Sequence, residues 1–236
     1  MAKFRKVIEK EAQDKFYDLC TDGTVQEVRD AINSGTIDVN YVYEYESTAL
    51  MGAARYNTPD VVRELLEAGA DLTAREQDGN TALGWAAASN TAEVVNLLLS
   101  AGASVKVGRY DGLSALLLAA KKNTPEVIMT LINAGANVNA KDTNNMTALL
   151  YAAMNNPHPE VVNILIEAGA EDITDNNGMT ALLLAASWNT PEVVKALIDA
   201  GADISVVDNF HMTAFDHARM NRKLEGSDVL ARLKEG

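Results

Sequence analysis

A three-residue anchor recurs through most of this 236-residue chain at a constant spacing of 33 residues. The anchor is Thr-Ala-Leu or a close variant, and five of its six copies continue into a pair of alanines. A period of this length indicates small units that cannot bury their own apolar faces and must stack on one another. The anchors begin at Thr48, Thr81, Ser114, Thr147, Thr180 and Thr213.

Each unit predicts two short antiparallel helices preceded by a projecting turn. Thr81 is expected to cap a first helix, whose small alanines allow close approach of its neighbour. In Thr58-Pro59, the threonine hydroxyl is expected to cap a second helix that has proline at its first position. The second helix carries an apolar stripe and ends at a glycine such as Gly102. The pattern therefore predicts an all-α chain.

The period, the Thr-x-Leu-x-x-Ala-Ala start and the Leu-Leu-x-x-Gly-Ala ending resemble ankyrin repeats from about Ala12 to Leu233. The resemblance implies an all-α solenoid of stacked helix-turn-helix units, with seven repeats of which two are caps. We expect an N-terminal helix and capping repeat in 1–45, five full repeats in 46–207 and a C-terminal capping repeat in 208–236. The histidine of the family's Thr-Pro-Leu-His is absent, so another contact must order the turns.

The turn glycine of three units is replaced by Glu46 and His211 near the two ends, and by Asn145 inside the array. In left-handed backbone geometry a side chain costs on the order of 1–2 kcal/mol, and asparagine costs least. We therefore predict distorted turns at Glu46 and His211.

Composition excludes several classes of partner. The formal charge of -13, from 20 basic and 33 acidic residues, argues against nucleic acid, because phosphate binding needs clustered Lys and Arg. Apolar runs are too short to span a membrane, and the charged N-terminal residues lack the apolar core of a secretory signal. A single cysteine cannot form an internal disulfide. We expect a cytoplasmic protein.

Groups that could carry catalysis are few and far apart. Cys20 aligns with small core alanines, so we expect a buried, inert thiol. His217 occupies a slot filled elsewhere by Trp85, Tyr151 or leucine, which indicates half-buried packing. Six units separate Cys20 from His217, whereas nucleophilic catalysis needs hydrogen-bonded groups. With no phosphate loop or convergent metal ligands either, we expect no enzyme, no cofactor and no metal.

The resemblance implies that partners bind on the concave face, at the turn tips and the exposed side of the first helices. Carried over position by position, the candidate partner-binding residues are Tyr45, Tyr56, Tyr110, Leu113, Lys121, Lys122, Met146, Met154, Met179, Trp188, Phe210 and Met212.

One position of the turn becomes apolar toward the C-terminus, and it shares its face with Met154, Trp188, Phe210 and Met220. Methionines beside aromatic residues are typical of protein-binding surfaces. The alternative is that the side chains at this position pack between adjacent turns, in place of the missing histidine, and are buried. The four residues of this stripe are Leu113, Met146, Met179 and Met212.

A tyrosine cluster, Tyr41, Tyr43, Tyr45 and Tyr56, offers a second aromatic surface near the N-terminus. We expect part of this cluster to fill the junction with the first cap. The other part would remain available to a partner.

The combined hypothesis is a monomeric, non-catalytic module that binds a partner protein of unidentified kind. One alternative is a structural unit that assembles with its own copies through the apolar stripe. The other is a small-molecule or enzymatic site near Asp216 and His217.

Overall fold

The structure is a computed structural model and describes residues 2–234. Met1, Glu235 and Gly236, at the ends of the first and last predicted segments, lie outside the described residues. Fourteen α-helices and two short 3-10 segments account for the regular structure of this range, which contains no strand. The chain forms two compact units, Met1–Tyr110 (unit 1) and Asp111–Gly236 (unit 2). No helix within residues 2–234 combines the length and the apolar character needed to cross a bilayer.

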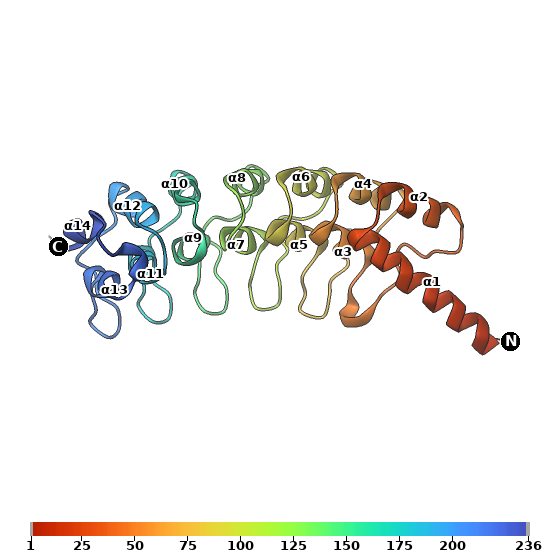
Figure 1. Cartoon of the computed structure of the whole chain (residues 1–236), viewed down its shortest axis with the longest axis horizontal. Helices are drawn as coiled ribbons and strands as arrows, with labels where there is room; N and C mark the ends of the chain where they lie inside the picture. Colours follow the sequence, from red (N-terminus) through yellow and green to blue (C-terminus); the bar gives the residue numbers. More distant parts are fainter. Residues whose placement is uncertain (1, 235–236) are drawn as a thin grey trace. The chain divides into compact units, whose positions relative to one another are not determined.

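Unit 1 consists of three helix pairs in two layers (Figure 1). The first helices α1, α3 and α5 pack side by side, and the second helices α2, α4 and α6 form the other layer. Helix α1, with 21 residues, is more than twice as long as the others in this unit. The elements are α1 (Ala2–Asp22), α2 (Val25–Asn33), η1 (Glu44–Glu46), α3 (Ala49–Tyr56), α4 (Pro59–Glu67), α5 (Ala82–Ser89) and α6 (Ala92–Ser100).

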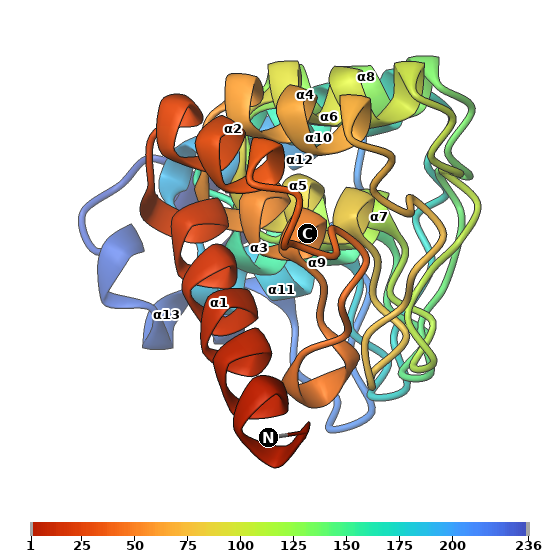
Figure 2. The same ribbon diagram turned by 90° about the vertical axis from the view of Figure 1, so that its right-hand side faces the viewer.

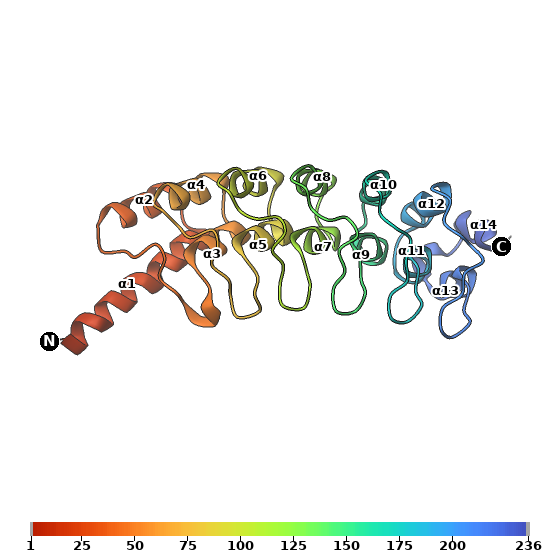
Figure 3. The ribbon, with the colours of Figure 1, turned by 180° about the vertical axis from the view of Figure 1, so that it is seen from behind.

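Unit 2 repeats the same arrangement with four helix pairs. Helices α7, α9, α11 and α13 form the first layer, and α8, α10, α12 and α14 form the second. Within each unit, the turns project from one side of the first-helix layer (Figures 2 and 3). The elements are α7 (Ala115–Ala120), α8 (Pro125–Asn133), α9 (Ala148–Asn155), α10 (Pro159–Glu167), α11 (Ala181–Trp188), α12 (Pro191–Asp199), α13 (Ala214–Met220), η2 (Arg222–Leu224) and α14 (Val229–Lys234).

The anchor residues begin the first helices as predicted. The Thr81 hydroxyl accepts the backbone N–H of Gly84, which satisfies one of the free donors at the start of α5. The predicted cap at Thr58 is wrong, because its hydroxyl takes no N–H from α4. The Asn57 side chain is bonded there instead, and its oxygen accepts the N–H of Thr58 at 2.7 Å.

Small and branched apolar residues fill the space between the two layers. The alanine pair of each full repeat is completely buried, as Ala152 and Ala153 show in unit 2. The paired valines of the second helix, such as Val161 and Val162, are buried to the same degree. Because alanine has so little volume, adjacent first helices approach closely. Within each unit, every repeat packs its apolar side chains against the neighbouring repeats, so the core extends along the stack.

A ladder of buried and part-buried asparagines ties successive repeats together within each unit. The carbonyl of Ala153 has no helical donor, because the residue four positions later is Pro157. The side-chain amide of Asn189 donates to this carbonyl and to that of Asn156, both at 2.9 Å. Equivalent bonds are made by Asn90 in unit 1 and by Asn156 and Asn221 in unit 2.

Backbone hydrogen bonds and turn carboxylates order the turns, where the sequence left the ordering contact open. Successive turns are joined by main-chain bonds, as from Thr143 N to Asp111 O at 3.0 Å. Within a turn, one oxygen of Asp142 accepts the N–H groups of Asn144 and Met146 at 2.8 and 2.9 Å. Asp175 and Asp208 hold their turns in the same way.

The two predicted turn distortions have different outcomes. The first turn is distorted as expected, because Tyr45 and Glu46 are both left-handed and form the short η1. The prediction is wrong at His211, which adopts a φ of 62° within an ordinary turn. Bonds from Asp208 N to Met212 O and from His211 N to Asp208 O close that turn. These bonds and the Asp208 carboxylate outweigh a backbone cost of about 1–2 kcal/mol.

Candidate functional site

Large exposed apolar side chains gather on one side of each unit. We call this side the turn face: it comprises the turn tips and the last residues of the first helices. Among residues 10–234, six of the nine exposed large apolar side chains lie on it, and Met129 alone lies on a second helix. The six are Tyr45, Tyr56 and Tyr110 in unit 1, and Trp188, Phe210 and Met220 in unit 2.

The predicted exposed stripe of unit 2 is wrong for three of its four residues. Leu113, Met146 and Met179 are only 7–9% exposed, so they pack inside the unit. Each follows the left-handed residue of its turn and donates its N–H to the turn carboxylate, which directs the chain back toward the first helix. Met212, the fourth residue of the stripe, is half-buried.

Two aromatic side chains remain exposed on the turn face of unit 2. Phe210 is 76% exposed at the tip of its turn, and Trp188 is 63% exposed at the end of α11. Met154 is half-buried at the equivalent end of α9. Lys122 is exposed, whereas the Lys121 ammonium lies 4.5 Å from the centre of the Tyr151 ring.

The tyrosine cluster of unit 1 divides between packing and exposure, as expected. The Tyr43 hydroxyl donates to the Gln13 carbonyl of α1 at 2.9 Å, and the Tyr43 ring contacts those of Tyr17 and Tyr41. Burial raises the pKa of Tyr43 above its ordinary value. Tyr45 and Tyr56 stay more than half exposed.

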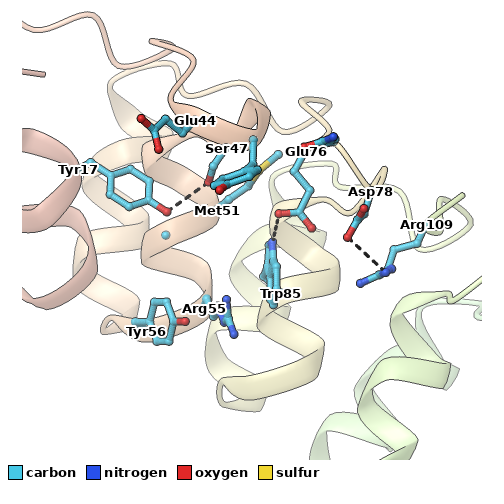
Figure 4. Close-up of a pocket in the computed structure, with 13 residues that line it drawn as sticks. Tyr17, Glu44, Ser47, Met51, Arg55, Tyr56, Glu76, Asp78, Trp85 and Arg109 are labelled. Carbon is cyan, nitrogen blue, oxygen red and sulfur yellow. Dashed lines mark hydrogen bonds and ion pairs between the residues drawn. The ribbon is translucent and has the colours of Figure 1, made fainter. Parts of the chain in front are cut away.

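A pocket of about 430 Å³ opens on the turn face of unit 1 (Figure 4). Its lining comes from α1, α3, α5 and three successive turns. The Tyr17 hydroxyl and Ser47 are hydrogen bonded at 3.2 Å on one wall. The residues that matter for its chemistry are Glu44, Tyr45, Arg55, Tyr56, Glu76, Asp78, Trp85 and Arg109.

Arg55 lies between two aromatic rings of this pocket. Its guanidinium carbon is 3.9 Å from the centre of the Trp85 ring and 4.7 Å from that of Tyr56. Trp85 is held in turn by its indole N–H, which donates to a Glu76 carboxylate oxygen at 3.0 Å. The arrangement immobilises a cation on the turn face, and such stacking is favourable when it is partly desolvated.

Neither this stack nor its supporting acid was predicted, although a sequence signal exists. In unit 2 the same relation joins Lys121 to Tyr151, whose hydroxyl donates to Asp142 at 2.6 Å. In both cases an aromatic residue follows the cation by 30 positions and the acid by nine. This spacing extends from one repeat into the next, so it is visible only when adjacent repeats are compared.

The residues considered for catalysis have structural partners. Cys20 is completely buried, as predicted, and burial raises the pKa of its thiol to about 12. His217 is half-buried, and its Nε2 lies 2.9 Å from Asp208 Oδ2. The Asp216 carboxylate accepts the N–H and the hydroxyl of Thr213 at the start of α13. Among the described residues, no three His, Cys, Asp or Glu side chains converge to hold a metal ion.

A family model and a solved structure that match this chain agree on one family. A family model described as ankyrin repeats (3 copies) matches residues 19–109, 116–208 and 158–234. The crystal structure of the human ASB11 ankyrin repeat domain is similar, with a TM-score of 0.79 and 24% sequence identity over 93% of this chain and 96% of that one. At this identity the likeness shows the fold. The search of curated proteins gave no match.

Proposed function

Since this chain belongs to the ankyrin repeat family, whose members are generally protein–protein interaction modules, we propose that it binds a partner protein on the turn face of its units. The fold is typically a non-catalytic scaffold, and we extend that role to this chain. We also propose a monomer in the cytoplasm, where a lone thiol such as that of Cys20 stays reduced.

One observation carries the proposal: the exposed aromatic side chains, joined by Met220, concentrate on the turn face, above an ordered core. Aromatic residues supply much of the binding energy of protein interfaces. The turns that present them are already held by main-chain and carboxylate hydrogen bonds. A surface ordered before binding loses little conformational entropy on association, which favours affinity.

The two alternatives have less support. Self-assembly through the apolar stripe loses most of its surface, because Leu113, Met146 and Met179 are buried. A site at Asp216 and His217 would have to release side chains that already cap α13 and bond to Asp208.

The test is affinity capture with variants of the full chain. Immobilised wild type retains its partner from a lysate of the source cells, and mass spectrometry identifies the retained protein. We expect the double variant Trp188→Glu with Phe210→Glu to retain at least about tenfold less of it, because charges enter an apolar interface. Met129→Glu, at an exposed position of α8, is the matched control and should retain as much as wild type.

All three positions are exposed, so the variants are expected to fold. The proposal is contradicted if the turn-face variant retains as much of the partner as wild type does. Matching far-UV circular dichroism of the three proteins checks that the comparison concerns binding.

A further inference from the structure

Arg55 is a cation that lies against two aromatic rings and has no hydrogen-bond acceptor among residues 2–234. Its guanidinium carbon lies over the Trp85 ring at 3.9 Å and over the Tyr56 ring at 4.7 Å from the ring centres. Its Nε is buried without a hydrogen-bond partner, and Arg55 forms no ion pair with a carboxylate of the described residues. A guanidinium in this state retains its in-plane donors, which match the two oxygens of a carboxylate.

Two of the three acids of the same pocket are engaged elsewhere. Glu76 accepts the indole N–H of Trp85, and Asp78 forms an ion pair with Arg109 at 3.4 Å. Glu44 is exposed at the rim. The charge of Arg55 is therefore left without a direct counter-ion, and a partly buried cation gains most from a ligand that supplies one.

We propose that this pocket binds the side-chain carboxylate of an aspartate or glutamate in an extended segment of the partner, with Arg55 as the donor. The inference rests on the proposed function, because the segment belongs to a partner protein. The lining comes from three successive turns, so a chain that lies across them passes over the pocket and presents an internal residue to it. Exposed Tyr45 and Tyr56 offer flat apolar surfaces to the neighbouring residues of that segment.

The charge of the lining favours a carboxylate over a phosphate group. Three acids, Glu44, Glu76 and Asp78, accompany two arginines, Arg55 and Arg109, so the net formal charge is 2 − 3 = −1. Repulsion grows with the charge of the ligand, and a phosphoryl group carries about −1.5 to −2 at neutral pH. A monoanion keeps the bidentate bond at a smaller electrostatic cost.

The test uses a phage-displayed library of random dodecapeptides, selected on the full-length protein. Peptides fused at their C-terminus have no free terminal carboxylate, so any acid that is selected is a side chain. We expect wild type to enrich Asp or Glu at one aligned position, and Arg55→Gln to lose this preference. Arg63→Gln, on the exposed side of α4, is the matched control and should select as wild type does.

A selected peptide, made with an amidated C-terminus, then gives dissociation constants by fluorescence polarisation. Changing its acid to the corresponding amide should weaken binding to wild type at least about tenfold and have little effect on Arg55→Gln. Because this change is made in the peptide, it cannot alter the fold of the protein. Arg55→Lys should bind weakly, since it keeps the charge without the planar fork.

Three results would overturn the inference: selected peptides without a preferred acid, equal binding by Arg55→Gln and wild type, or tighter binding when phosphoserine replaces the acid. The proposed function fails by a different result, when turn-face substitutions such as those at Trp188 and Phe210 leave capture of the native partner unchanged. The two failures are therefore distinguishable.

Discussion

Replacing Asn189 with alanine should destabilise unit 2 far more than replacing an asparagine on the surface would. The substitution removes the donor from two carbonyls, those of Ala153 and Asn156, in residues that are completely buried. The Ala153 carbonyl has no substitute in its own helix, because Pro157 lacks an N–H. The N–H of Thr190 also loses its acceptor, the Asn189 oxygen at 2.9 Å.

A buried carbonyl that loses its partner costs about 1–3 kcal/mol. Two such groups predict a loss of roughly 2–4 kcal/mol for Asn189→Ala, after some relaxation of the helix ends. With a urea dependence of about 2 kcal/mol per molar, the midpoint of unfolding should fall by about 1–2 M.

The assay is equilibrium urea unfolding of the full chain by far-UV circular dichroism, with hydrogen exchange and mass spectrometry to locate the effect. The control is Asn155→Ala, an exposed asparagine at the end of α9, which should change stability by less than about 0.5 kcal/mol. Faster exchange in α9 and α11 is expected only for Asn189→Ala. Equal midpoints for the two variants would refute the argument that the asparagine ladder holds the repeats together.

Three further predictions concern unit stability and reactivity. Cys20 should react with Ellman's reagent at pH 8 at least about a hundredfold more slowly in the native protein than in urea, because burial and a pKa of about 12 suppress the thiolate. Equal rates would contradict it. Gly112→Ala should cost roughly 3 kcal/mol and Gly135→Ala about 1 kcal/mol in urea unfolding. Both glycines have positive φ, but only at Gly112 would a Cβ lie within 2.8 Å of backbone. Hydrogen bonds from the N–H and hydroxyl of Thr213, which caps α13, lower the pKa of Asp216. The stabilisation that the Asp216 carboxylate gives the folded state is therefore present above its unfolded pKa of about 4 and is lost as the pH falls. The deficit of Asp216→Asn should therefore shrink between about pH 6 and pH 3, and a constant deficit would count against the cap.

The repeat period made the fold predictable, because each repeat supplies its own helix-capping residue, its own alanine pair and its own apolar side of the second helix. Thr81 and Cys20 could be placed by alignment with equivalent positions, and both placements are confirmed. The division into a first cap, five full repeats and a last cap remains a prediction.

Exposure on the turn face could not be predicted in the same way. Whether Met146 meets solvent depends on how its turn folds back, and a buried carboxylate, Asp142, controls that geometry. The stack of Arg55 on Trp85 joins two repeats and recurs in only part of the chain. It is therefore missed when each repeat is analysed separately. Asparagine recurs every 33 residues from Asn57 to Asn189, but this spacing does not show that the side chains of Asn90 and Asn189 donate to carbonyls of the preceding repeat.

The central claim is that a partner contacts the turn face and leaves the second helices free. Hydrogen exchange of the complex with the captured partner tests it most directly, because it reports on every segment at once. We expect protection in segments that contain the turn tips and first helices, including those with Tyr56, Trp188 or Phe210, and unchanged exchange in α4, α8 and α12. Protection confined to the second helices would contradict the account.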